Sequence, residues 1–201
     1  MKLSILQNVN KNFIAASSTF SDSSHLLVSG NGSSYLCFDK FTDKIEYFED
    51  DSSSKFINSS SRICSLGNIQ LLVEFTGLIW KIENKVKSKL IQLEHEVFDI
   101  CKIYFQDRYY LIAVACDGCV SIVDLENADK NDDSEKLEVY LFDLGMNIRS
   151  SGCGTFYRFN KMYNEFEDQN ILVLVTFQGK YLVFDLEQLL IDKLKLKNEL
   201  F

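Results

Sequence analysis

Apolar runs of roughly five to eight residues alternate with polar turn clusters along this chain, and one arrangement of them recurs. In the segments 71–83, 111–124 and 172–185, an apolar run leads into a tight Gly turn and a second apolar run. The second run ends on an acidic residue six positions after the Gly. A looser copy occupies 26–39. Such recurrence at intervals of tens of residues is typical of repeat folds, whose units bury their faces against their neighbours.

These runs predict β-strands, because they are rich in β-branched and aromatic residues and are separated by Gly, Asn, Asp and Ser. The continuous apolar runs 111–115 and 171–175 predict inner strands buried on both faces, and the Lys-rich run 85–89 predicts an outer edge strand. The sequence therefore predicts an all-β, β-propeller-like fold with about four blades of antiparallel four-stranded sheets. The expected strands are 13–18, 25–30, 35–40, 44–48, 56–66, 69–75, 78–83, 86–93, 97–105, 109–116, 119–125, 137–142, 148–159, 171–177 and 180–186.

We expect one domain over 1–201, built from units at about 1–50, 51–94, 95–145 and 146–201. The last unit lacks an assigned outer strand. The segment 189–196 alternates like an exposed strand but also fits one side of a helix, and we favour the strand. Two acidic insertions, 127–135 and 164–169, are expected to be loops, where binding specificity often resides.

The segment 93–126 places a His in a turn before an inner strand, an Asp-Gly hairpin and a strand that ends on Asp. In this order it resembles a repeat of the WD-repeat β-propeller family. Val123-Asp124 stands at the family's Trp-Asp position, as do Phe38-Asp39, Ile82-Glu83 and Phe184-Asp185. None of the four carries Trp there, Trp80 lies two residues before Ile82, and His95 alone offers the turn His. The resemblance implies a degenerate propeller.

The repeat number is low, because the family usually has seven repeats and this chain shows about four. Three interpretations are open. The chain closes as a small ring with 2–6 completing the last blade, it is an open arc covered by a protein partner or a second copy, or it is a truncated fragment of a larger propeller protein without independent function.

The composition indicates a soluble globular chain, with 46% hydrophobic residues among 201 and a net charge of −8. That charge disfavours nucleic acid as a partner and fits a basic or neutral protein better. The start lacks a signal-peptide core, and no apolar run reaches the roughly 18 residues of a membrane helix. The six cysteines are therefore expected to be reduced thiols of an intracellular protein, cytoplasmic or nuclear.

The motifs that could take part in catalysis or metal binding are better explained by structural roles. Cys116-Asp117-Gly118-Cys119 has CxxC spacing but straddles a predicted hairpin, and the sequence offers no second ligand pair for zinc. The segment 129–134 imitates the start of a calcium loop but lacks its Gly and its final acid. His25 and His95 lie in separate units, and 145–154 lacks the ending of a phosphate loop. We expect no catalytic residue, metal or cofactor.

The sequence favours a non-catalytic scaffold that mediates protein–protein interaction. Tyrosine is common at interfaces, so loop aromatics could form a contact surface, although core placement is the alternative. These candidates are Tyr109, Tyr110, Tyr157, Tyr163 and Phe166. A small enzyme with a carboxylate site in a central channel is the other alternative. It would use Asp39, Glu83, Asp124 and Asp185, whose equivalent repeat positions indicate turn stabilisation instead.

Overall fold

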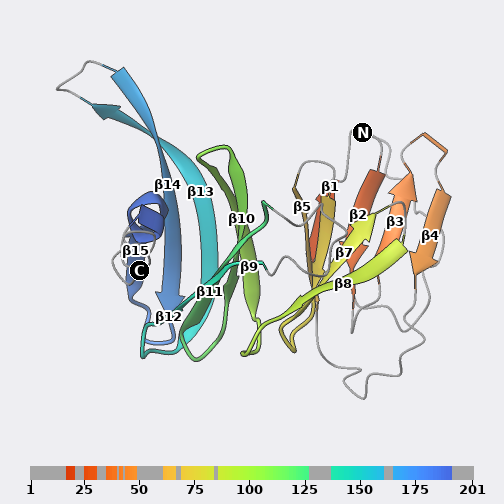
Figure 1. Cartoon of the computed structure of the whole chain (residues 1–201), viewed down its shortest axis with the longest axis horizontal. Coiled ribbons are helices and arrows are strands. Elements are labelled where there is room, and N and C mark those ends of the chain that lie inside the picture. The colour runs from red at the N-terminus through yellow and green to blue at the C-terminus, as the bar shows by residue number, and fades with distance from the viewer. Residues whose placement is uncertain are drawn as a thin grey trace. The chain divides into compact units, whose positions relative to one another are not determined.

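A computed structural model describes residues 17–20, 25–30, 35–39, 41–42, 44–48, 61–66, 69–83, 86–126, 137–160 and 165–191. The chain forms two compact units, Met1–Val97 and Phe98–Phe201. In both units the described residues form antiparallel sheets whose strands follow one another along the sequence (Figure 1). The prediction of an all-β fold with about four antiparallel sheets is confirmed.

The first unit contains two four-stranded sheets. Each strand pairs with the next one along the chain, because short turns join antiparallel neighbours. The first sheet comprises β1 (Ser17–Phe20), β2 (His25–Ser29), β3 (Tyr35–Asp39) and β4 (Lys44–Phe48). The second comprises β5 (Arg62–Leu66), β6 (Ile69–Val73), β7 (Leu78–Glu83) and β8 (Val86–Gln92).

The core of the first unit lies between these two sheets. Leu27, Tyr35 and Cys37 of the first sheet cluster with Ile63 and Leu72 of the second. Strand alternation explains this face, since Leu27 lies directly opposite Cys37 across the β2–β3 pair. The burial of these side chains therefore holds the two sheets together.

Two buried serines join the sheets by reciprocal hydrogen bonds. The Ser61 hydroxyl donates to the carbonyl oxygen of Gly30 at 2.8 Å, and the Ser29 hydroxyl donates to the carbonyl oxygen of Ser61 at 2.9 Å. Both side chains are fully buried. The hydrogen bonds offset the cost of burying two hydroxyl groups and fix where the chain enters the second sheet.

The second unit contains a four-stranded sheet and a three-stranded sheet. The apolar core lies between them and includes Ile112, Val120 and Ile122 of the third sheet with Leu172 and Leu174 of the fourth. The third sheet comprises β9 (Asp99–Phe105), β10 (Arg108–Val114), β11 (Cys119–Asp124) and β12 (Val139–Asp143). The fourth comprises β13 (Ile148–Asn160), β14 (Glu165–Thr176) and β15 (Tyr181–Asp185).

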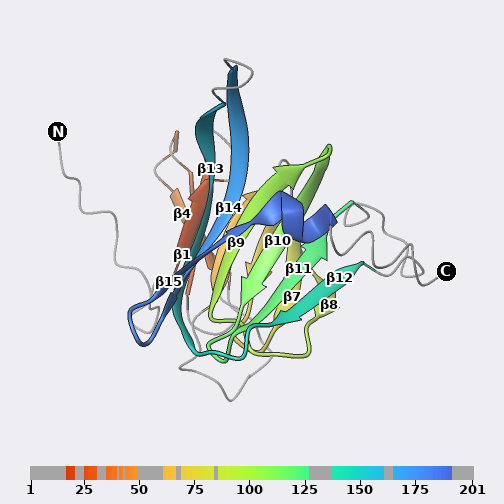
Figure 2. The same cartoon turned by 90° about the vertical axis from the view of Figure 1, so that its left-hand side faces the viewer.

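One acidic insertion forms a strand instead of the predicted loop. Residues 165–169 belong to β14, which pairs with β13 from Asn160↔Glu165 to Ile148↔Thr176. Figure 2 shows this long hairpin extending beyond the other strands of its unit. In a two-stranded ribbon each strand pairs along one edge and leaves its other edge to water, so such a ribbon accommodates polar residues that would not suit an inner strand. Asn164 and the other insertion, 127–135, lie outside the described residues.

The predicted outer strand 189–196 is wrong over its described part, because 186–191 is helical. The Asp185 carboxylate accepts hydrogen bonds from the amides of Glu187 at 3.0 Å and Gln188 at 3.1 Å, which is the arrangement of a helix N-cap. Leu186 and Leu190, four residues apart, are buried in the core of the second unit. The cap and this apolar pair favour a helical turn over continued strand. Residues 192–201 and the proposed closing segment 2–6 lie outside the described residues.

Candidate functional site

The repeated carboxylates stabilise turns, as the sequence pattern indicates. Asp39 accepts from the Phe41 amide at 2.8 Å and from the Thr42 hydroxyl at 2.8 Å, and the Thr42 hydrogen bond is the main reason that the pKa of Asp39 is lowered. Asp124 accepts from the Glu126 amide at 2.9 Å. Together with the Asp185 helix cap, these contacts keep each carboxylate within the turn that follows its own strand.

Glu83 differs from the other repeat carboxylates, because its partner is a lysine. The Lys81 ammonium group lies 3.2 Å from the Glu83 carboxylate, and the Lys81 side chain is largely buried while that of Glu83 is exposed. Glu83 thus compensates the charge of a buried lysine. Each of the four repeat carboxylates thus has a structural partner, which favours structural roles over a shared carboxylate site.

The CxxC segment forms the β10–β11 turn. Gly118 has φ +98°, a conformation that favours glycine, and the Cys119 amide donates to the Asp117 carboxylate at 3.0 Å. Burial, followed by the charge of Asp117, raises the pKa of the Cys119 thiol, which opposes thiolate reactivity. In the part of the chain that the structure describes, no group of three or more His, Cys, Asp or Glu residues could hold a metal ion.

The clearest exposed feature of the second unit is the tip of the β9–β10 hairpin. Its two turn residues, Gln106 and Asp107, have φ of 49° and 60°. Consecutive left-handed residues make the tight turn whose twist matches that of the flanking strands. The turn places Tyr104 directly opposite Tyr109. We call Tyr104, Asp107 and Tyr109 the tyrosine tip.

The two rings of the tyrosine tip are in contact and exposed. Their centroids lie 4.8 Å apart with the planes tilted by 49°, and the side chains are 52% and 40% exposed for Tyr104 and Tyr109. The Tyr104 hydroxyl donates to the Asp107 carboxylate at 3.1 Å, and this hydrogen bond is the main reason that the pKa of Tyr104 is raised. The tip thus presents an aromatic surface with a carboxylate at its end.

The backbone below the tip is well anchored. The Tyr109 carbonyl accepts from the Leu125 amide at 3.0 Å, which extends the β10–β11 pairing almost to the tip. Arg108, on the strand face opposite Tyr109, bridges Asp124 at 3.2 Å and Glu126 at 2.7 Å, and these carboxylates raise its pKa. These contacts fix the backbone that carries the two tyrosines.

The predicted contact residues differ in their exposure and in how far the structure describes them. Tyr109 is exposed, but Tyr110 is 3% exposed, because strand alternation turns it into the core of the second unit. Tyr110 therefore cannot form part of a contact surface. Tyr157 lies in β13 and Phe166 in β14, whose backbone alone is described there, and Tyr163 lies outside the described residues. Tyr104 was not among the predicted contact residues, although its alternation with the buried Ile103 indicates an exposed position.

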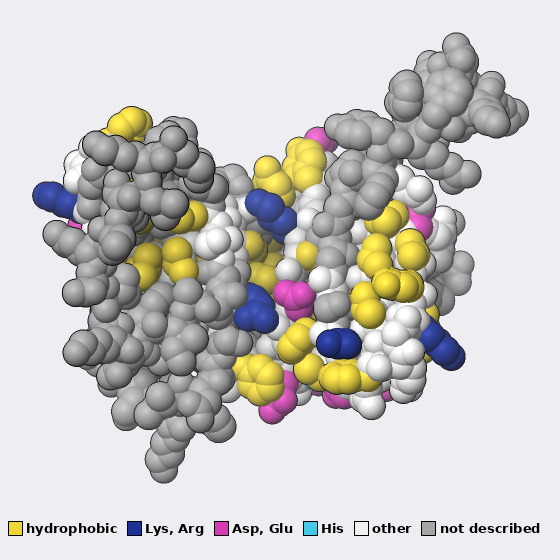
Figure 3. Space-filling view, turned by 180° about the vertical axis from the view of Figure 1, so that it is seen from behind, with side chains coloured by type: hydrophobic (Ala, Val, Ile, Leu, Met, Phe, Trp, Pro, Cys, Tyr) yellow, Lys and Arg dark blue, Asp and Glu magenta, His cyan; other side chains and the backbone are white. Residues whose placement is uncertain are grey.

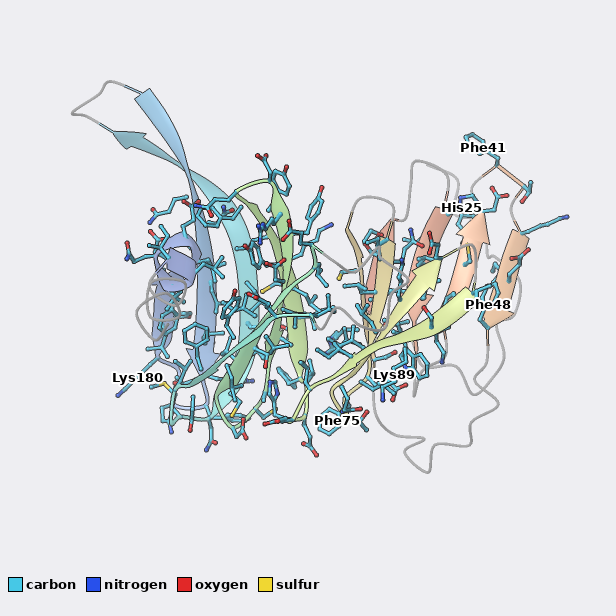
Figure 4. The ribbon with its side chains drawn as sticks, in the orientation of Figure 1. His25, Phe41, Phe48, Phe75, Lys89 and Lys180 are labelled. Carbon is cyan, nitrogen blue, oxygen red and sulfur yellow. The ribbon has the colours of Figure 1, made fainter. Side chains whose placement is uncertain are left out.

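A second exposed apolar region lies on the last sheet. Phe177, Tyr181 and Val183 are each more than 60% exposed (63%, 73% and 62%). Figure 3 shows hydrophobic side chains gathered at the surface of the second unit. In the first unit, Phe41 is 79% exposed at the turn after β3, where it points away from the sheet (Figure 4).

One pocket of the second unit is small, apolar and partly open to the surface. An apolar cavity of about 20 Å³ lies between the third and fourth sheets, lined by side chains that include Ile122, Phe142 and Leu189. This volume is close to that of a single water molecule, and an apolar lining offers no hydrogen bonds to hold one. We interpret it as a packing defect below the helical turn. No helix in the described residues is long and apolar enough to cross a membrane.

No protein-family model and no curated protein matches the sequence. Among solved structures, the computationally designed Ika4 protein aligns at 12% identity with a TM-score of 0.58, over 92% of this chain and 99% of Ika4. BamB from Moraxella catarrhalis aligns at 13% identity with a TM-score of 0.54, over 92% of this chain and 54% of BamB. The WD40 domain of SCAP from fission yeast aligns at 12% identity with a TM-score of 0.52, over 86% of this chain and 42% of that chain.

The chain thus spans about half the length of the two natural structures it resembles. Identities this low concern the fold alone. The repeat pattern, the sheet order and these structural similarities agree with one another. The chain therefore has the fold of a degenerate WD-repeat-like β-propeller with about four blades.

Proposed function

We propose that this chain is a non-catalytic protein-binding scaffold, a subunit of an intracellular complex in the cytoplasm or nucleus, and that the tyrosine tip is a contact site. The observation that carries the proposal is the exposed, backbone-anchored pair of Tyr104 and Tyr109. Tyr side chains bury a large area at little entropic cost, because they have few rotatable bonds. Folds of this kind are widely used for protein interaction, which supports the scaffold role.

The chemistry of the tip favours a basic partner segment. An Arg or Lys side chain can stack on a Tyr ring, an interaction worth about 0.5–1 kcal/mol at an exposed site, while its charge faces the Asp107 carboxylate. Asp124 and Glu126 together carry one more charge than the Arg108 side chain that pairs with both, which leaves a net negative charge near the hairpin. The net charge of −8 also attracts a basic partner over longer range.

The test compares the wild-type chain with Tyr104→Ala/Tyr109→Ala and with Phe41→Ala as the control. Phe41 is more exposed than either tyrosine and lies in the other unit. Affinity purification from the native cell, followed by mass spectrometry, is expected to recover a protein that the double variant loses and the control retains. Binding of that protein should weaken as salt rises, because screening reduces the electrostatic attraction. Equal recovery by all three proteins would exclude the tyrosine tip as the contact site.

A short synthetic peptide distinguishes charge from aromatic recognition. An Arg-containing peptide with neutral flanking residues is expected to bind the wild-type chain more tightly than its Glu-containing counterpart, and Asp107→Asn should reduce that difference. Loss of discrimination without loss of affinity would assign the charge preference to Asp107 and the affinity to the rings. Equal binding of the two peptides by the wild-type chain would contradict the basic-partner assignment.

A further inference from the structure

The fourth sheet presents an unpartnered copy of a face that the third sheet buries. Ile171 and Tyr110 occupy equivalent positions, since each pairs with the acidic residue that ends the following strand. Tyr181 and Val120 are likewise equivalent, two positions after their turn glycines. The whole face of the third sheet is Tyr110, Ile112, Val114, Val120 and Ile122, and that of the fourth is Ile171, Val173, Val175, Tyr181 and Val183. We call the latter set the β14–β15 face.

The two equivalent faces differ in burial. In the third sheet all five side chains are buried, because the next sheet along the chain covers them. On the β14–β15 face, Tyr181 is 73% and Val183 is 62% exposed, and the other three are partly exposed. No described residue of the second unit therefore covers the outer part of this face. Its large, mainly apolar side chains are of the kind that pack against another sheet.

The side chains of the fourth sheet that cover the third sheet show which residues pack against such a face. Leu172, Leu174, Leu182 and Phe184 of the fourth sheet pack into the shared core. In the first sheet, the equivalent positions are Leu26, Val28, Leu36 and Phe38, counted from the His25–Asp39 and Ile171–Asp185 pairs. Three of these four residues are identical between the sheets, and the other is Val in place of Leu.

That first-sheet surface is the opposite face from the one that packs on the second sheet. Leu27, Tyr35 and Cys37 alternate with Leu26, Leu36 and Phe38 along β2 and β3 and belong to the core of the first unit. Leu26, Val28 and Phe38 are left partly exposed. The chain thus has two complementary apolar faces. The β14–β15 face is equivalent to the covered face of the third sheet, and the face on β2 and β3 is equivalent to the one that covers it.

We infer that the β14–β15 face binds the first sheet of a second copy of this chain. Each copy offers both complementary faces, so two copies related by a twofold axis form two equal contacts and leave neither face open. The similar natural structures support this occupant, because this chain matches 54% and 42% of their length. Two copies therefore amount to about one such propeller. This association uses residues outside the tyrosine tip, so the two proposals fail independently.

The test is the mass of the full chain in solution, measured by sedimentation over a range of concentrations. The wild-type chain is expected to reach twice its 23.2 kDa. Val183→Glu places an unpaired charge at the contact, and dimerisation should require roughly 100-fold more protein or disappear. The matched control is Val86→Glu, because Val86 is 67% exposed on β8 and belongs to neither face. Its dimer should persist.

Mixing two monomeric variants tests the pairing of unlike faces. Phe38→Glu alters the first-sheet face and Val183→Glu the β14–β15 face, so a mixed dimer keeps one unaltered contact and should re-form in part. Neither variant should dimerise alone. If Phe38→Glu does not fold, hydrogen exchange of β15 provides the second measurement, since its amides should exchange more slowly as the wild-type concentration rises.

Three results would overturn the inference. A wild-type chain that stays monomeric at every concentration, with exchange of β15 independent of concentration, means that something other than a second copy covers the face. A Val183→Glu variant that dimerises like the wild type means that the contact lies elsewhere. Equal loss of the dimer in Val86→Glu means that added charge alone opposes association. All three leave the proposed role of the tyrosine tip untouched.

Discussion

Replacing Gly118 by Ala tests how closely the repeated turn is packed. A Cβ atom at this position would lie 2.3 Å from the carbonyl oxygen of Met146 and 3.2 Å from its amide nitrogen. Both are backbone atoms, so no side-chain rotation relieves the overlap. The same turn is tied to this segment by hydrogen bonds from the Leu144 amide to the Gly118 carbonyl at 3.2 Å and from the Ile148 amide to the Cys116 carbonyl at 2.8 Å.

The expected loss of stability has three parts. The left-handed backbone costs an L-residue about 1–2 kcal/mol, partly offset by about 0.4–1 kcal/mol from the less flexible unfolded chain. Displacing the 144–148 segment adds about 1–3 kcal/mol of overpacking and weakens two hydrogen bonds worth about 1 kcal/mol each. Gly118→Ala should therefore cost about 3–5 kcal/mol, a large share of the roughly 5–15 kcal/mol that stabilises a typical domain.

Gly179→Ala is the matched control, because it makes the same change at the equivalent turn of the next sheet. Gly179 has φ +77°, and no described atom lies within 4 Å of the added Cβ. Its cost should be about 1 kcal/mol, from the backbone term alone. Urea unfolding followed by circular dichroism gives both values from the midpoint and slope. If the two variants lose stability equally, within about 1 kcal/mol, the close approach of Met146 is refuted.

Three further predictions concern charge and burial. The pKa of Asp39 is lowered in the folded chain, so its contribution to stability is present above 3.8 and should be lost as pH falls below it; melting temperatures against pH should show a smaller acid loss for Asp39→Asn. Burial raises the pKa of Tyr35 to about 12, so stability should fall as pH rises from 10 to about 12, and urea unfolding across this pH range should show less of this loss in Tyr35→Phe. Asp124→Ala removes the hydrogen bonds from Glu126 and Arg108 and should cost about 1.5–3 kcal/mol in urea unfolding, whereas a cost below about 0.5 kcal/mol would contradict the structural role of this carboxylate.

The strands of the inner hairpins were predictable because several signals coincide there. The bounds of β7, Leu78–Glu83, agree with the expected 78–83, since the turn at Gly77 directly precedes the strand and Glu83 ends it. The 13-residue β13 was expected over 148–159, close to its observed Ile148–Asn160. Its partner β14 was expected to begin at 171 and begins at Glu165. Polarity alone does not separate a loop from a two-stranded ribbon, because both leave their side chains exposed.

The tyrosines show the limit of reasoning from neighbouring residues. Tyr109 and Tyr110 are adjacent and chemically identical, yet one is exposed and the other buried. Their difference depends on which strand face meets the core, which requires the register of β10 with its neighbours. The ring contact of Tyr104 with Tyr109 requires also the turn at Gln106 and Asp107, where neither residue is Gly or Asn. Sequence signals for this tight turn are therefore weak, although the alternation of Ile103 and Tyr104 was available.

The equivalence of the sheets shows which features of the last sheet bear on the inferred contact with a second copy. Turn glycines and the repeat carboxylates make local contacts within their own units, so they maintain the framework and carry no information about a partner. A face position is different, because its burial depends on whether another sheet packs against it. Val120 and Ile122 are covered by the next sheet, whereas Tyr181 and Val183, at the same two positions, are not. Since all four are large and mainly apolar, the last sheet has the composition of a covered sheet, and this is the observation behind the inferred contact with a second copy.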